Sequence, residues 1–522
     1  MCRGFFVLNN KLSLFKVNLI KSRKYWLIYL VFILICSLSF FSMKNYIHPK
    51  MEIAVIFLVS ILGIFFISFY HYLNTDNDLY KLAFIIILTF GIICSFLMPI
   101  CAISDGAEHF VRSEITSEGI LVPNYENGSY ITIQSTLDLI KNCKHTLSTK
   151  FDSINGSRGN IFQTDADTKS INYTHVKYPS AFAQNPFYGY LAQALGMDIA
   201  KALNLNAIWL LWLGRICNVI LYSVLVSFAV KKTPILKVPM IAFSCIPLAI
   251  YQSSSLSIDA FINGLAILMV SYFFYMYKAP NKSLGKKELI VFSIMGLLLG
   301  LTKITLFLFM LLILCVPKSR FKEDKYYYLG ILSIIVVGVI GVLWIKYYAS
   351  FAFQNSFRHN YWILKHINNK SQLSYVLSHK FASLIAVLQM FTKYLGSDLY
   401  FKSSNLFVNK INSVYLMFIG AIVLLYPIKK VNIKSKIGVF IVLIMIYIGT
   451  YITFLFTWTP VGQLNKVSGV QSRYFLPLFT LLPFIFGFNH MEGDKSSIDT
   501  WIIVLTISFL SLMLISLAIK YY

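Results

Sequence analysis

The stretch KLAFIIILTFGIICSFLMPICAISDGAEHFVRSEITSEG (residues 81–119) decides the fold class. Its first half is an apolar run of the length that an α-helix needs to cross a bilayer, about 20 residues. Its second half places Asp105, Glu108, His109 and Arg112 within one short segment. The sequence therefore predicts a membrane span that ends directly at a charged cluster.

The whole chain shares this apolar character. It has 522 residues, of which 57% are hydrophobic and 13% charged, and its mean hydropathy is +0.69. These values predict a polytopic membrane protein. The net charge of +25 does not indicate a nucleic-acid partner, because the lysines and arginines lie mostly in short loops between apolar runs. The eight cysteines are scattered without a CxxC pair, so no disulfide framework or cysteine metal site is expected.

We predict an all-α fold with about 13 transmembrane helices. The predicted spans are residues 25–43, 51–70, 81–100, 205–230, 238–252, 258–277, 289–301, 304–317, 326–349, 413–428, 437–457, 474–489 and 500–518. Residues 1–80 are interpreted as a two-span addition, and residues 81–522 as the membrane core.

The loops predict the orientation in the cell membrane. Four short loops, residues 231–237, 278–288, 318–325 and 429–436, are basic, which is typical of cytoplasmic loops. The N-terminus is then cytoplasmic. Two long loops, about 101–204 and 350–412, face outside, and each is expected to carry interfacial helices.

Two segments of the long loops are candidates for the membrane surface. Residues 177–196 hold several aromatic residues around two prolines, which favours interfacial anchoring or, alternatively, a platform for a sugar or prenyl chain. Residues 374–396 form an irregular apolar run that we interpret as a lid lying along the surface.

Charged groups near the spans suggest a polar cavity. A charge inside a bilayer costs about 2.5 to 3.5 kcal/mol, so each one needs a reason. The predicted topology places five such groups on the outer side: Arg215, Asp259, Lys303, Lys346 and Arg473. Each of the last four also has a structural interpretation as a cap, a turn lysine or a snorkelling side chain. Arg215 lies deeper, with Asn218 on the same helical face, and we expect a carboxylate or bound phosphate as its partner.

The charged cluster allows two interpretations. On a helix its four ionisable residues form one polar stripe opposite an apolar face, which suits a helix lying on the membrane surface. In the structural interpretation, Asp105 is an N-cap, Glu108 completes a capping box, and Glu108 pairs with Arg112. In the functional one, a carboxylate is a general base, and Arg112 with the outer cations holds an anion such as a lipid phosphate. The spacing of Asp105 and His109 also permits a divalent metal, but we predict no metal site and no cofactor.

Several motifs, in order, resemble the DUF2142 family of membrane proteins, relatives of the GT-C glycosyltransferases, between about residues 97 and 473. They are SDGAEHFVRSEITSEG (104–119), YPSAFAQNPFYGYLAQALG (178–196), LGRICNVILY (213–222), SSSLSIDAFINGLA (253–266) and GVQSRYFLPL (469–478). One departure concerns the first motif, where the family often has a proline and two adjacent acids. Here Gly106 follows Asp105 and the second acid is Glu108, so the identity of the base stays open.

The resemblance implies a GT-C-like membrane fold and a glycosyltransferase that moves a sugar from a polyprenyl-phosphate donor to a cell-surface glycan or glycolipid at the outer face. By position it implies Asp105 as first choice for the base, Glu108 as second, and His109 and Arg112 as their partners. The expected substrate-binding residues are Arg112, Tyr178, Arg215, Asn218, Asp259, Lys303, Gln471, Arg473 and Tyr474; donor-phosphate roles for Arg215, Lys303 and Arg473 come from the charge argument. Two alternatives remain: a glycan polymerase or ligase acting on diphospholipid-linked oligosaccharides, and a transporter or flippase for a lipid-linked sugar.

Overall fold

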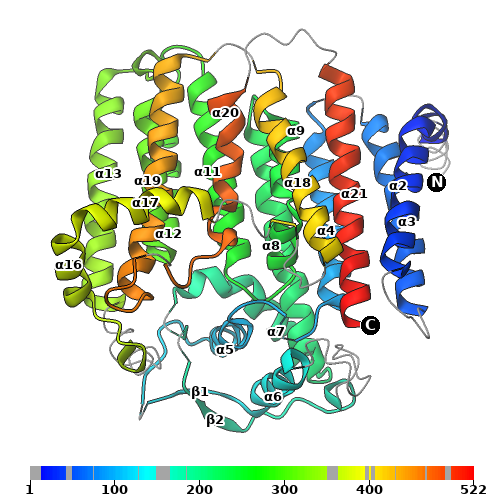
Figure 1. Ribbon diagram of the computed structural model, residues 1–522, viewed down its shortest axis with the longest axis horizontal. Coiled ribbons are helices and arrows are strands. Elements are labelled where there is room, and N and C mark those ends of the chain that lie inside the picture. The colour runs from blue at the N-terminus through cyan, green and yellow to red at the C-terminus, as the bar shows by residue number, and fades with distance from the viewer. Residues whose placement is uncertain are drawn as a thin grey trace.

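Long helices run side by side and carry a smaller mixed region at one end (Figure 1). The computed structural model describes residues 13, 15–42, 50–73, 76–100, 102–126, 128–148, 165–180, 182–183, 185–349, 362–393, 399–400, 406–428, 431–464, 467–487 and 495–522. We call the end of the bundle that carries the mixed region the loop end. The opposite end, where residues 278–288 and 318–325 lie, is the basic end.

The bundle is built from helices of very different lengths. They are α2 (Arg23–Ser42), α3 (Lys50–Tyr72), α4 (Leu79–Leu97), α8 (Ile208–Lys232), α9 (Lys237–Ser244), α10 (Pro247–Ser253), α11 (Asp259–Lys278), α12 (Lys286–Thr302), η3 (Ile304–Cys315), η4 (Lys318–Arg320), α13 (Asp324–Trp344), η5 (Ile345–Ala349), α18 (Leu406–Leu425), α19 (Ile433–Thr457), η6 (Ser472–Leu481), α20 (Leu482–Phe486) and α21 (Lys495–Tyr521).

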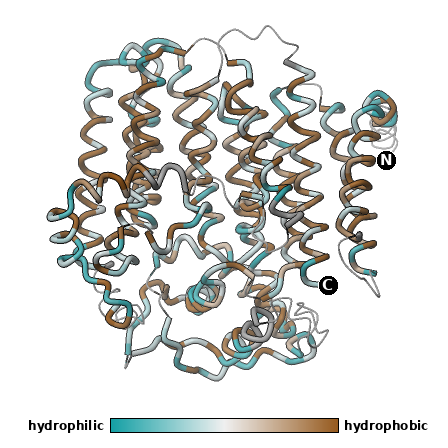
Figure 2. The backbone as a smooth tube through the Cα atoms, in the orientation of Figure 1, coloured by the Kyte–Doolittle hydropathy of each residue, from teal (hydrophilic) through white to brown (hydrophobic). Residues whose placement is uncertain are grey.

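The prediction of a polytopic membrane protein is confirmed. Eight described helices are long and apolar enough to cross a membrane, namely α2, α3, α4, α8, α11, α13, α19 and α21. The other five predicted spans coincide with shorter or interrupted helices: α9 with α10, α12, η3, α18, and η6 with α20. Hydrophobic residues dominate along the helices, while hydrophilic ones gather towards both ends (Figure 2).

Two of the short runs are 3₁₀-helices, η3 and η6. A 3₁₀-helix rises about 2.0 Å per residue, against about 1.5 Å for an α-helix. A short run therefore covers more of the bilayer in this conformation than it would as an α-helix.

The predicted span 238–252 is broken into α9 and α10 because Pro247 interrupts it. Proline has no N–H to donate, and it disfavours helical backbone in the residue before it. Ile246 accordingly leaves the helix with a ψ of 127°. After α10, residues 254–258 lead into α11 at the loop end.

The first two helices attach to the last one. The Tyr29 hydroxyl donates to the Val59 carbonyl of α3 at 2.7 Å and lies 2.8 Å from the Ser511 hydroxyl of α21. A neighbouring α3 position must be glycine, since a Cβ at Gly63 would lie 2.1 Å from the Tyr29 ring. The interpretation of residues 1–80 as an addition to the membrane core stays a prediction.

The first long loop folds into the mixed region at the loop end. It contains α5 (Gly106–Ser117), β1 (Tyr130–Ile133), α6 (Gln134–Ser148), η1 (Asp165–Asp167), β2 (His175–Tyr178), η2 (Phe187–Tyr190) and α7 (Leu191–Ala202). The two strands pair antiparallel, with Tyr130 opposite Tyr178. Among the described residues this pair forms the one sheet, and the other regular elements are helices.

The structure corrects the prediction that the charged segment is a helix on the membrane surface. In α5, Phe110, Val111 and Ile115 are buried in a small core with residues of β1, α6, α7 and α8. The apolar face that suggested a membrane surface packs against protein instead.

Helix α7 has an exposed apolar face. Leu191 and Leu195 are exposed on it and Leu203 is exposed directly after it, while its other side packs closely on α8. A Cβ at Gly196 would lie 2.2 Å from the Leu213 carbonyl oxygen, so only glycine permits this crossing.

The second long loop carries α16 (Asn369–Ser378) and α17 (Lys380–Lys393). In Figure 1, α17 runs across the direction of the long helices. Phe381, Leu384 and Leu388 are exposed on it, which suits contact with lipid. The interpretation of this segment as a lid stays a prediction.

Candidate functional site

Asp105 is the residue from which the site is built. It precedes α5 with a φ of +62°, in the left-handed region that asparagine and aspartate adopt more readily than most residues. Its side chain makes no capping bond to the helix, so the expected capping box is absent. The carboxylate points elsewhere and is 40% exposed.

Arg473, at the start of η6, joins two carboxylates. It is 5% exposed, and its Nη2 donates to Asp105 Oδ2 at 3.0 Å while its Nη1 donates to Asp259 Oδ2 at 3.1 Å. A buried guanidinium of this kind is stabilised by charge-assisted hydrogen bonds from its two terminal nitrogens, Nη1 and Nη2. Arg473 therefore does not snorkel to the surface; it connects α5, α11 and η6.

Lys303 adds a second cation to this cluster. It follows α12, and its ammonium lies 3.3 Å from the centroid of the Tyr474 ring. The guanidinium of Arg473 lies 5.2 Å from the centroid of the same ring. Within the described part of the chain, Lys303 forms no ion pair, and its contact is the aromatic face.

We call Asp105, Asp259, Lys303, Arg473 and Tyr474 the ionic cluster. The sequence predicted that these residues lie on one side of the membrane, and the structure brings them together at the loop end of four elements. Phe454 of α19 supports the cluster, since its ring stacks on that of Tyr474 at 5.2 Å between centroids.

Glu108 lies one turn along α5 and faces the segment after β2. The Ser180 hydroxyl donates to Glu108 Oε2 at 2.7 Å, and the Tyr178 hydroxyl lies 3.5 Å from Oε1. The Ser180 oxygen also accepts the backbone N–H groups of Phe182 and Ala183. Glu108 thus holds this segment against α5.

His109 is buried and engaged at both ring nitrogens. Nδ1 lies 2.8 Å from the Tyr190 hydroxyl, and Nε2 lies 3.3 Å from the Ser257 hydroxyl. Asn185 donates to Tyr190 at 3.1 Å, which leaves the phenol free to donate to Nδ1. His109 therefore links α5 to η2 and to the turn before α11.

Two tyrosines of the aromatic segment 177–196 point into the protein. Tyr190 is fully buried, and the Tyr188 hydroxyl donates to the Leu298 carbonyl of α12 at 3.0 Å. These two tyrosines fasten the segment to the protein and so correct the expectation that they are membrane anchors.

Arg112 has a different partner set from the one expected. It is fully buried and donates to the carbonyls of Asn185, Ile120 and Leu121 and to the Thr116 hydroxyl. Within the described residues it forms no ion pair, so the predicted pair with Glu108 is not formed. Its N–H groups hold the backbone at Ile120, Leu121 and Asn185 against α5, so they face protein oxygens instead of a ligand.

Arg215 also binds neutral oxygens instead of the carboxylate or phosphate that we expected. Its guanidinium donates to four backbone carbonyls at 2.6 to 2.9 Å. They are those of Ser95, Met98, Pro99 and Ile100. These carbonyls lie in the last turn of α4 and directly after it, where carbonyls lack helical partners and favour a cation. Arg215 thereby fixes the chain that leads to Asp105.

The two remaining predicted residues, Asn218 and Gln471, form no side-chain hydrogen bond with the ionic cluster within the described part of the chain. Asn218 donates to the carbonyls of Ser255 and Ser257 at 2.7 and 3.0 Å, which shapes the turn before Asp259. Gln471 precedes η6 in extended backbone, and its carbonyl accepts the Tyr474 N–H.

The donor set does not resemble a metal centre. The described residues hold no group of three or more His, Cys, Asp or Glu side chains arranged for a metal ion. The cluster instead pairs a partly exposed carboxylate with two buried or half-buried cations, an arrangement suited to proton transfer beside an anion.

A family model described as "Predicted membrane protein (DUF2142)" matches residues 88–482. The chain belongs to this family. All residues of the ionic cluster lie within the matched range, as does the whole mixed region of the loop end. No curated protein and no solved structure matches the chain.

Sequence reasoning missed one buried acid of the mixed region. Glu114 of α5 is fully buried; Thr132 donates to its Oε2 at 2.5 Å, and Lys201 Nζ lies 3.4 Å from its Oε1. Lys201 also contacts Glu118. The hint in the sequence was its place on the apolar side of α5, beside Val111 and Ile115.

The first prediction concerns Arg215. Replacing it with alanine leaves the last carbonyls of α4 buried without partners, and we expect a loss of stability on the order of 3 kcal/mol. Thermal unfolding of the purified protein in detergent measures it. Arg23→Ala, at an exposed position of α2, is the matched control. Equal melting temperatures for the two variants would contradict the role of Arg215.

The second prediction concerns pH. Burial raises the pKa of Glu114 from its ordinary 4.5 to about 7. The folded state then binds this proton more tightly, so the carboxyl's contribution to stability is full below about pH 4.5 and is lost as the pH rises through about 7. We expect the melting temperature of Glu114→Gln to depend less on pH than that of the wild type between about pH 4.5 and 7. The exposed Asp138→Asn variant is the control, and parallel profiles for wild type and Glu114→Gln would refute the prediction.

Proposed function

We propose that this protein is a GT-C-type glycosyltransferase that transfers a sugar from a polyprenyl-phosphate donor to a cell-surface glycan or glycolipid. One observation carries the proposal: the partly exposed Asp105 carboxylate lies in the same cluster as two cations, Arg473 and Lys303. The resemblance to GT-C enzymes gives the reaction class.

Asp105 acts as the general base. Its Oδ2 is held by Arg473, while the 40% exposure of the side chain leaves room for an acceptor hydroxyl. Glu108 is less suited to this task because a hydroxyl lies at each of its oxygens, that of Tyr178 at Oε1 and that of Ser180 at Oε2, whereas Asp105 accepts at Oδ2 alone within the described residues. The geometry thus favours the first of the two candidate carboxylates.

The reaction balances without a cofactor. The acceptor oxygen forms a bond to the anomeric carbon of the donor sugar as the bond from that carbon to the phosphate oxygen breaks. The acceptor proton passes to Asp105, and the polyprenyl phosphate leaves with the bonding electrons. Negative charge grows on the departing phosphate, where a cation in low dielectric stabilises it strongly.

Lys303 is the cation for that phosphate. Arg473 already has both terminal nitrogens on carboxylates, whereas the Lys303 ammonium contacts an aromatic ring. Asp259 keeps Arg473 oriented and compensates its charge. The predicted topology places the cluster on the outer side, since the basic loops lie at the other end.

The base assignment is tested by substitution. We expect Asp105→Asn to reduce transfer by about 10² to 10⁴-fold, because the amide cannot accept the proton, and Glu108→Gln to reduce it less. The readout is the composition of the surface glycan in cells that carry each variant in place of the wild type. Asp167→Asn, on an exposed acid of the mixed region, is the control. Wild-type glycan from well-expressed Asp105→Asn would remove the assignment.

The phosphate assignment is tested by binding. A polyprenyl monophosphate is expected to raise the melting temperature of the wild type, and Lys303→Met to weaken this stabilisation by at least tenfold in apparent affinity. Lys346→Met, at an exposed position of η5, is the matched control. An unchanged response of Lys303→Met, with Asp105→Asn still inactive, would move the phosphate elsewhere without affecting the base.

A further inference from the structure

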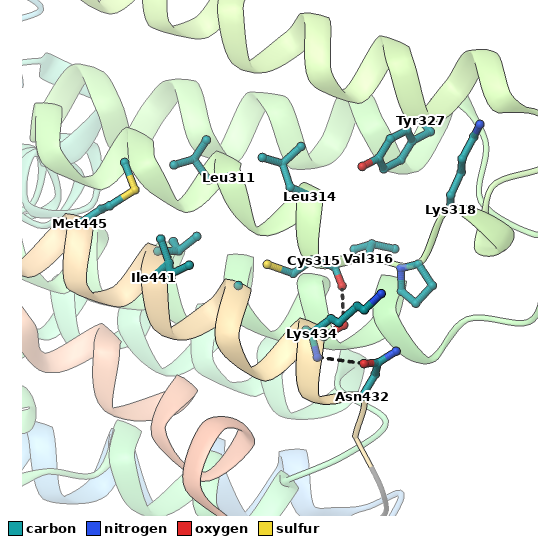
Figure 3. A pocket seen from close by; sticks show the side chains of 14 residues that line it. Leu311, Leu314, Cys315, Val316, Lys318, Tyr327, Asn432, Lys434, Ile441 and Met445 are labelled. Atoms are coloured by element: carbon teal, nitrogen blue, oxygen red, sulfur yellow. Dashed lines mark hydrogen bonds between the residues drawn. The ribbon is translucent and has the colours of Figure 1, made fainter.

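A pocket lies far from the ionic cluster, at the basic end of the bundle. Lys303 precedes η3 at one terminus, whereas the pocket opens around the other, between η3, α13 and α19 (Figure 3). Its volume is about 480 Å³. Nothing in the proposed reaction uses it.

The inner part of the pocket is apolar. Leu311 and Leu314 of η3 face Ile441 and Met445 of α19 across it (Figure 3). Leu314 is 47% exposed although it lies in an apolar helix. A Cβ at Gly438 would lie 2.7 Å from Cys315 Sγ, so this glycine lets α19 approach η3 and close the base of the pocket. An open apolar slot of this kind suits a hydrocarbon chain.

The mouth of the pocket is polar and positive. Lys318 and Lys434 both line it, with Asn432 and Tyr327 beside them. Lys318 pairs with Asp324 at 2.7 Å. The Lys434 ammonium forms no ion pair within the described residues, and its backbone N–H is capped by Asn432. One lysine is therefore available to an anion.

The charge around this mouth extends beyond the pocket. Three sequences that carry lysines, residues 278–288, 318–325 and 431–436, lie at this end of the chain's spans. Anionic headgroups are attracted to lysines next to a membrane, and basic pockets between spans bind them while acyl chains stay in the apolar part. The arrangement complements a molecule with an anionic head and an apolar tail.

We propose that this pocket binds an anionic phospholipid of the leaflet on the side of the basic loops. Its phosphate lies at Lys434, with Lys318 near it, and one acyl chain lies along Leu314, Ile441 and Met445. The site is separate from the ionic cluster and stands whether or not the protein is a glycosyltransferase.

Native mass spectrometry of the purified full-length chain tests the site. The protein is exchanged into detergent with equal amounts of phosphatidylglycerol and phosphatidylcholine, and retained lipid is counted. We expect one phosphatidylglycerol to be retained preferentially. Lys434→Gln should lower its retention about fivefold, as expected for one lysine near a headgroup, and Leu314→Trp should lower it by filling the apolar slot.

Two matched controls keep the result specific. Lys286→Gln removes an exposed lysine at the same end outside the pocket, and Leu332→Trp enlarges an exposed residue of α13 that does not line it. Both are expected to retain the lipid as the wild type does. Equal retention of the two lipids by the wild type overturns the proposal, as does equal retention by the pocket variants and their controls.

Discussion

The end of α4 is the constraint on which the candidate site depends. Arg215 binds the last carbonyls of that helix from inside the bundle, and the Tyr251 hydroxyl donates to the carbonyl of Ala102 a few residues later. The chain therefore leaves the membrane at a fixed point and in a fixed direction. Asp105 follows three residues after Ala102, so these contacts outside the ionic cluster help to fix the position of its backbone.

Three buried arginines serve this region in two ways. Arg112 and Arg215 bind neutral oxygens, which satisfy their hydrogen bonds and lock the chain before and after α5. Arg473 binds carboxylates and so carries the electrostatics of the site. A fixed scaffold of this kind is what an electrostatic site requires, because its groups must not reorganise as charge moves.

The sequence predicted the spans and the polar groups better than the partners of those groups. Hydropathy located the eight described helices that are long enough to cross a membrane, and the other five predicted runs coincide with shorter or interrupted helices. The basic loops placed Asp259, Lys303 and Arg473 at one end. The partners of Arg112 and Arg215 were unpredictable because backbone carbonyls leave no trace in side-chain chemistry. The burial of α5 was missed because an apolar face looks the same whether it meets lipid or the 130–140 segment.

The local geometry at Asp105 bears on the choice between its two roles. A capping aspartate directs its carboxylate at the free N–H groups of the first helical turn. The positive φ of Asp105 turns the side chain away from them and towards Arg473. Helix α5 therefore lacks a stabilising side-chain cap. The Asp105 carboxylate before it is bound by Arg473 and stays partly exposed. Such a local cost is expected where a side chain is placed for chemistry, and it supports Asp105 over Glu108 as the proposed base.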